Sequence, residues 1–147
     1  MREHLPDTRH SITHKFKIYS AGGVVKGFLT VGFYPDGRPA ELFITVDTVD
    51  AAFRCMSNGF ACMVSLCLQH GVPVADIIRK FRAWRSEPCG VTDHPSIHVA
   101  QSLPDYIARF LETLTSQPAP VVTSAMPQAR KNASGCPGGL INPTKEE

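Results

Sequence analysis

The sequence predicts an α+β domain in which a three-stranded antiparallel sheet is followed by three helices packed on one face of that sheet. Two observations carry this prediction. Apolar residues alternate with polar ones before residue 47, and after it they recur at the spacing of amphipathic helices as far as residue 114. Short turns with Gly and Pro separate the alternating stretches, and such turns join neighbouring antiparallel strands. We therefore expect strands first and helices afterwards, in the order βββααα.

The three strands are expected where the alternation is clearest, and the second of them contains two glycines. Gly27 and Gly32 interrupt the second alternating stretch, which indicates a β-bulge or a close approach of another backbone. Between the second and third strands, Asp36 and Gly37 form a turn in which Gly tolerates a positive φ. The predicted strands are residues 14–19, 24–34 and 40–46, with Leu29, Val31, Phe33, Leu42, Ile44 and Val46 facing the core.

The first helix is expected to begin after an Asp or Thr cap in residues 47–50 and to end at Gly71, since Pro73 prevents its continuation. Its predicted buried stripe is Val49, Ala52, Phe53, Met56, Phe60, Met63, Val64 and Cys67. A second helix is expected over residues 74–85, with Ile77, Ile78, Phe81 and Trp84 facing the core. Residues 87–98 are expected to form a loop. The third helix is expected to open at Ser102, with Asp105 completing a capping-box pattern and Leu103, Ile107, Phe110, Leu111 and Leu114 facing the core.

The domain prediction divides the chain into three parts. Residues 1–13 are polar and basic and are expected to form an extended arm, residues 14–116 the folded domain, and residues 117–147 a disordered tail rich in Pro and Gly. The N-terminus lacks the apolar core of a signal peptide, and no run of about 18 apolar residues occurs. We therefore expect a cytoplasmic protein without a membrane span.

The charge and the cysteines exclude several classes of function. A formal net charge of +2 gives no strong nucleic-acid signal. The five cysteines contain no CxxC pair, which argues against structural zinc and against a secreted disulfide framework. No nucleophile elbow, phosphate-binding loop or metalloprotease motif is present, and no carboxylates are paired for acid–base work. We predict no catalytic residues, no metal and no cofactor.

Candidate ligand-binding residues are cations and hydroxyls, which suit a phosphate group. A charged edge strand protected against pairing would show the same composition, so both interpretations stay open for the cluster. His94 and Arg85 belong to the loop and to the helix end beside it, and a metal site at His94 is the weaker interpretation. The candidates are Arg9, Ser11, Thr13, His14, Lys15, Lys26, Arg85 and His94.

Six segments in register resemble the C-terminal domain of adenosylcobalamin-dependent (class II) ribonucleotide reductases, known as the TSCPD domain. The resemblance covers roughly residues 3–114. The segments are HLPDTRHSITHKF (4–16), KGFLTVG (26–32), DGRPAELFI (36–44), VSLCLQHGVP (64–73), EPCGVT (87–92) and SLPDYI (102–107). The large catalytic barrel of those reductases is missing here. The redox cysteine pair of their C-terminal tails is also missing, because the tail of this chain carries only Cys136.

The resemblance implies a non-catalytic module linked to ribonucleotide reductase and nucleotide metabolism, with an enzymatic activity of its own not expected. It would bind a nucleotide-type anionic ligand, a reductase subunit, or both. One alternative is a homo-oligomeric protein, for instance a viral one, that sequesters a small nucleotide signal in a pocket between protomers. Another is a purely structural interaction module. A homo-oligomer is expected because the apolar helical stripes are wider than one sheet can cover.

Overall fold

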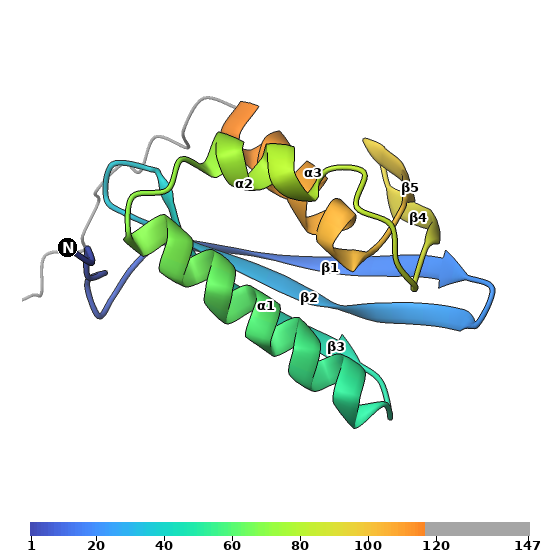
Figure 1. The fold of residues 1–147 in the computed structure, drawn as a ribbon. Helices are drawn as coiled ribbons and strands as arrows, with labels where there is room; N and C mark the ends of the chain where they lie inside the picture. The colour runs from blue at the N-terminus through green and yellow to red at the C-terminus, as the bar shows by residue number, and fades with distance from the viewer. Residues whose placement is uncertain (117–147) are drawn as a thin grey trace, which may run out of the picture.

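The computed structural model describes residues 1–116, and the predicted disordered tail with Cys136 lies outside the described residues. The described chain forms one sheet with three helices (Figure 1). The strands lie in the order β3-β2-β1-β4-β5, and all neighbours are antiparallel. In chain order the elements are β1 (Ser11–Ser20), β2 (Gly23–Phe33), β3 (Pro39–Asp47), α1 (Ala51–Gln69), α2 (Val74–Phe81), β4 (Gly90–His94), β5 (Ile97–Ala100) and α3 (Leu103–Ser116).

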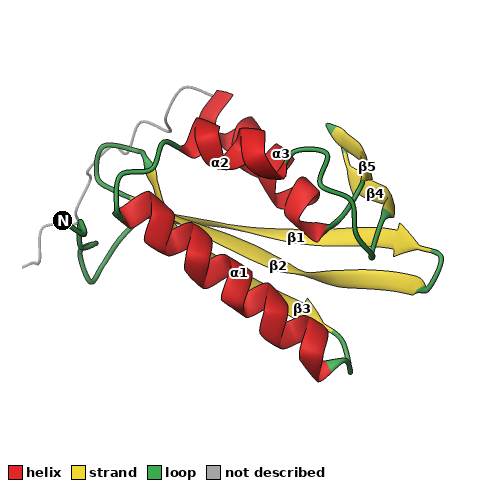
Figure 2. Ribbon diagram, in the orientation of Figure 1, coloured by secondary structure: helices red, strands yellow, loops and turns green. Residues whose placement is uncertain are grey.

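The α+β class and the three helices are confirmed, but the sheet has five strands and the prediction of three is wrong. The additional strands β4 and β5 form a hairpin inside and just after the predicted loop 87–98 (Figure 2). The hairpin is held to the sheet by backbone pairing, with Ile18 opposite Thr92 and Tyr19 opposite Val91. Strands of five and four residues are too short to show a clear alternation. Gly90 and Pro95 are typical of loops, and for this reason the sequence pattern of residues 87–98 indicated a loop.

Only one face of the sheet is buried, because all three helices cover the same side. The expected core residues Leu29, Val31, Phe33, Leu42, Ile44 and Val46 are buried there. The close approach of another backbone expected at Gly27 is confirmed, since a Cβ at that position would overlap the backbone carbonyl oxygen of Thr45 on β3. An irregularity in the β2–β3 register follows Gly32, which confirms the bulge expected in this stretch.

Helix α1 begins and ends as predicted but buries a different arc. The Asp50 carboxylate accepts the N–H groups of Ala52 and Phe53 at 2.9 and 3.0 Å, and Gly71 follows the helix with a φ of 81°. The predicted buried stripe is wrong at Val49, Met56 and Met63, which are exposed by 102%, 73% and 61%, and at Ala52, which is exposed as well. Val64 is buried as predicted, and Phe53, Phe60 and Cys67 are partly buried against the core. The other buried residues of α1 lie outside the predicted stripe: Ser57, Ala61, Leu68 and Gln69.

The error in the stripe has a physical cause, because nearly the whole circumference of α1 is apolar. Among the described residues, α1 is the one helix whose length and composition would allow a membrane span, a test that core helices of soluble proteins also pass. Only 22% of the most apolar 18-residue stretch of α1 is buried. Since α1 lies along β3 at the edge of the sheet, it has a narrow contact with the core and leaves the rest of its apolar surface uncovered.

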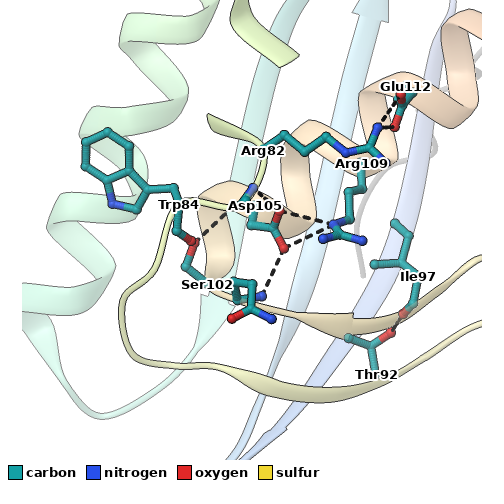
Figure 3. A network of polar contacts seen from close by, with 10 residues as sticks. Arg82, Trp84, Thr92, Ile97, Ser102, Asp105, Arg109 and Glu112 are labelled. Carbon is teal, nitrogen blue, oxygen red and sulfur yellow. Dashed lines mark hydrogen bonds and ion pairs between the residues drawn. The ribbon is translucent and has the colours of Figure 1, made fainter. Parts of the chain in front are cut away.

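Helix α2 ends at Phe81, four residues before the predicted end, and Trp84 is 48% exposed rather than in the core. The chain leaves the helix at Ala83, whose φ of 63° is left-handed. A buried carboxylate on α3 holds this turn: Asp105 accepts the N–H of Ala83 at 2.7 Å and the N–H of Gln101 at 2.9 Å. Arg109 donates to the same carboxylate, and Ser102 donates to the carbonyl of Trp84 (Figure 3).

Helix α3 opens as expected, with Ser102 Oγ accepting the N–H of Asp105 at 3.1 Å. The carboxylate of Asp105 does not complete the capping box, because it accepts the N–H of Gln101 instead of that of Ser102. Four of the five predicted core residues of α3 are buried, and Leu114 is partly buried.

Candidate functional site

The uncovered face of the sheet gathers most of the candidate residues. We call this the open face and define it by the side chains that alternate with the core residues. Thr13 lies opposite Thr30, Lys15 opposite Phe28 and Lys17 opposite Lys26, so the rows run across β1 and β2. They continue on β3, where Phe43 lies opposite Thr30 and Thr45 opposite Phe28. Five of the candidates lie on or beside this face: Arg9, Ser11, Thr13, Lys15 and Lys26.

Most cations of the open face are paired with a carboxylate. Arg9 forms a bidentate ion pair with Glu41, and the hydrogen bond that Arg9 donates to this carboxylate raises the pKa of Arg9. Lys17 lies 3.7 Å from Asp93, and Lys26 lies 3.1 Å from Asp47. Within residues 1–116, Lys15 is the open-face cation for which the structure shows no such partner. A phosphate would therefore meet an uncompensated charge at Lys15.

The Arg9–Glu41 pair belongs to the fold as much as to a binding face. Glu41 is buried, and its side chain lies across Gly32, where a Cβ would come within 2.8 Å of the Glu41 Cγ. Glycine is thus required opposite Glu41 so that the carboxylate can reach Arg9. A substitution of Arg9 would leave a buried carboxylate without its cation, so Lys15 is the cleaner position for a ligand test.

Exposed aromatic side chains on the same face were missed by the sequence analysis. Phe28 and Phe43 are exposed by 47% and 52%, and Tyr19 by 46%. The alternation that assigned Leu29, Val31 and Phe33 to the core already places Phe28 on the other side, and the same holds for Phe43 between Leu42 and Ile44. The available signal was therefore an aromatic residue at a position that the strand period assigns to solvent.

The structure brings His14 and His94 together on the opposite, helix-covered side. Their rings are 5.2 Å apart, and His14 Nε2 lies 2.9 Å from the hydroxyl of Tyr106 on α3. His14 also stacks on Phe110 at 4.6 Å. Burial, and next the neighbouring His94, lower the pKa of His14, while burial lowers that of His94. The described residues contain no group of three His, Cys, Asp or Glu side chains suited to a metal ion.

This pair of histidines predicts a pH-dependent stability. A folded-state pKa below the unfolded value of about 6.5 means that the unfolded chain binds protons more readily, so stability is present above that pH and is lost as the pH falls through it. We expect the free energy of unfolding, measured in urea, to decrease between about pH 7 and about pH 5. The double variant His14→Gln/His94→Gln should lose most of this slope, and an unchanged slope would contradict the assignment.

Arg85 and Cys89 lie apart from both clusters. Arg85 is exposed in the connection between α2 and β4, and the structure shows it in no ion pair with a described carboxylate. The Cys89 thiol lies 3.4 Å from a carboxylate oxygen of Glu87, and this hydrogen bond is the main cause that raises the pKa of Cys89. A raised pKa disfavours the thiolate, so Cys89 has the properties of an inert loop cysteine.

Comparison with known proteins identifies the family. The TSCPD domain family matches residues 5–115. The chain is 47% identical over 110 residues to the vitamin B12-dependent ribonucleotide reductase of Rhodopirellula baltica, a match that covers 75% of this chain and 10% of the relative. It is 37% identical over 111 residues to that of Streptantibioticus cattleyicolor, covering 76% and 18%. The corresponding values for Agrobacterium fabrum are 40% over 111 residues, 75% and 8%.

The matched segment thus spans less than a fifth of these relatives, and no solved structure matches the chain. The matched range contains all five strands and nearly all of the three helices. The chain belongs to the TSCPD domain family.

Proposed function

We propose that this chain is a non-catalytic TSCPD module that docks on a ribonucleotide reductase polypeptide through the uncovered side of α1. The observation that carries the proposal is the apolar surface of this helix. Among the exposed residues of α1 only Arg54 and Asn58 have polar side chains, whereas the apolar ones include Cys55, Met56, Cys62, Met63 and Leu66. A contiguous exposed apolar surface of this kind marks an interaction site.

The relatives support the choice of partner. In vitamin B12-dependent ribonucleotide reductases, the segment similar to this chain is about a tenth of the polypeptide. In those relatives, a domain of this family therefore occurs in the same polypeptide as a much larger remainder, which offers a surface for the domain to pack against. An apolar helix face that is covered by a larger neighbour explains why α1 needs so few polar residues.

The groove beside α1 favours the same side of the molecule. It has a volume of about 620 Å³ and runs between α1 and the edge strand β3. The N–H and carbonyl of Leu42 point away from β2 and are hydrogen-bonded to the Ser65 hydroxyl, which accepts from the N–H at 2.9 Å and donates to the carbonyl at 3.1 Å. Backbone direction alternates along a strand, so the groups of Ile44 also face outward, and no described residue hydrogen-bonds to them. A partner segment could extend the sheet at this point.

The proposal is tested by binding the chain to the Rhodopirellula baltica reductase from which the matching 110 residues have been deleted. We expect this shortened reductase to bind and the intact reductase, whose own segment occupies the site, to bind far less. The double variant Met56→Glu/Met63→Glu should weaken binding by about 30-fold, the effect of losing a buried apolar anchor. Biolayer interferometry, with circular dichroism of both partners, provides the measurement.

The matched control is Val99→Glu, because Val99 is 45% exposed on β5, at the other edge of the sheet. This variant should bind as the unmodified chain does. If folded shortened reductase does not bind, or if the control weakens binding as much as the α1 variant, the docking proposal is wrong. Light scattering of the chain alone tests the predicted homo-oligomer, and an oligomer dispersed by the α1 variant would show that a second copy covers this face instead.

A further inference from the structure

We infer that the open face of the sheet is a binding site for a ligand that combines a planar base with a phosphate, either a free nucleotide or a single-stranded oligonucleotide. This inference does not depend on docking to a reductase. It rests on an arrangement in which aromatic rings, an uncompensated lysine and hydroxyl groups occupy adjacent positions of the pleated surface. Stacking on aromatic rings, together with cations that follow the backbone, is how sheet surfaces bind single strands.

The aromatic part is formed by Phe28 on β2 and Phe43 on β3. Phe28 lies opposite Thr45, and Phe43 precedes Thr45 by two positions, so the two rings are diagonal neighbours on the same face. Diagonal neighbours in an antiparallel pair are separated by roughly 7–8 Å between Cα atoms, within reach of aromatic side chains. Both rings are about half exposed, which leaves their faces available to a base.

The open face is more apolar than an ordinary solvent face of an antiparallel sheet, where polar residues alternate with the core. Besides the two phenylalanines it exposes Tyr19, Val24, Val91 and Val99, each by 45% to 58%. No helix of the described chain covers this side, because the core residues of every strand face the other way. The exposed rings are therefore not a misplaced part of the core.

The phosphate part is formed by Lys15 and the hydroxyls beside it. Lys15 lies directly opposite Phe28, in the row next to that of Thr13 and Thr30. The Thr13 and Thr30 hydroxyl oxygens are 2.9 Å apart, so one of them donates to the other and the second keeps a proton to donate. Arg9, Lys17 and Lys26 already have carboxylate partners, so among the described residues of this face the positive charge without such a partner lies beside the aromatic pair.

The ligand class follows from this combination. A free phosphate would use Lys15 and the hydroxyls but would leave the rings without a function. An apolar ligand would use the rings but would leave Lys15 without one. A base stacked on Phe28 or Phe43 and joined through its sugar to a phosphate at Lys15 uses both, and its sequence preference would be weak because every base has a π-face.

The test uses the whole chain and two kinds of probe: fluorescein-labelled oligothymidylate and oligouridylate of ten nucleotides, and unlabelled ATP and dATP as competitors. Fluorescence anisotropy at low salt measures the dissociation constants. Phe28→Ala and Phe43→Ala should each weaken oligonucleotide binding by roughly 10- to 100-fold, the usual loss for one stacked base. Lys15→Ala should weaken binding and reduce the slope of log K against log salt concentration by about 1.

Two variants act as matched controls. Val72→Ala shortens an exposed side chain in the connection between α1 and α2, outside the open face, and Lys80→Ala removes an exposed lysine from α2, so neither should change the affinity. All substituted residues are at least partly exposed, and thermal unfolding of each variant verifies the fold.

The arms of the experiment distinguish the two sources of ligand. Competition by ATP or dATP at concentrations similar to the oligonucleotide indicates a site for a single nucleotide, and binding of the oligonucleotides alone indicates a strand platform; either supports the inference. Absence of binding by all probes overturns it. Binding that the two phenylalanine variants do not change, or that Lys80→Ala weakens as much as Lys15→Ala, also overturns it.

Discussion

Replacing Asp105 with Ala is expected to lower the free energy of unfolding by roughly 3–5 kcal/mol, the usual cost of removing one partner of a buried charged network. Asp105 is fully buried and accepts two backbone N–H groups, from Ala83 and Gln101, as well as the guanidinium of Arg109. Alanine would leave all three donors without this acceptor. For a domain of this size we expect the midpoint of thermal unfolding to fall by at least about 12 °C.

A second carboxylate on α3 provides the control. Glu112 pairs with Arg82, but both side chains are about half exposed, so Glu112→Ala should cost less than about 1 kcal/mol. Asp105→Asn keeps one acceptor oxygen and should fall between the two. If Asp105→Ala destabilised the protein no more than Glu112→Ala, the network around Asp105 would not be what holds the α2–β4 connection on α3.

The same network explains why the end of α2 could not be predicted. The helical pattern of Ile77, Ile78, Phe81 and Trp84 continues past residue 81, and local sequence contains nothing that stops it. The helix ends because Asp105, far along the chain, captures the N–H of Ala83 in a left-handed turn. An interaction between residues separated by 22 positions is a tertiary effect that propensity and periodicity do not contain.

Strand β2 shows the opposite case, in which the local sequence pattern is sufficient to predict which residues face the core. Leu29, Val31 and Phe33 alternate with residues of the other face, and a period of two leaves no freedom in their assignment. Helix α1 gave no such constraint, because apolar residues lie on most of its circumference. The hairpin of β4 and β5 was missed for another reason, since its place in the sheet is determined by pairing with β1 rather than by a pattern of its own.

The candidate residues divided in the same way. Ser11, Thr13 and Lys15 alternate along one strand, so their common face follows from the sequence, and Lys26 joins them through the β1–β2 pairing. His14 lies between two of these residues and therefore points to the helices, where it meets His94 and Tyr106. That His14 and His94 would be neighbours depended on the unpredicted hairpin, so no reading of the spacing could have joined them.

Replacing Gly27 with Ala is expected to destabilise the protein by about 3 kcal/mol, at the upper end of the cost of overpacking. A Cβ at this position would overlap the backbone carbonyl oxygen of Thr45 and lie 2.9 Å from the ring of Phe16. The first contact is with the backbone of the neighbouring strand, which cannot move without breaking β2–β3 pairing. Urea unfolding measures the loss, and Gly22→Ala is the control because no atom lies within 4 Å of its Cβ.

The large expected effect of Gly27→Ala follows from the contacts of the Phe16 ring. Its ring is fully buried opposite Gly27, covers the strand where the side chain is missing, and contacts Tyr106 with ring centroids 5.7 Å apart. Tyr106 in turn hydrogen-bonds to His14, so displacing Phe16 also disturbs the contact of α3 with β1. We therefore expect Gly27→Ala to reduce the pH dependence assigned to His14 as well as the stability. A variant that is destabilised but keeps the full pH slope would show that the strain stays within β2 and β3.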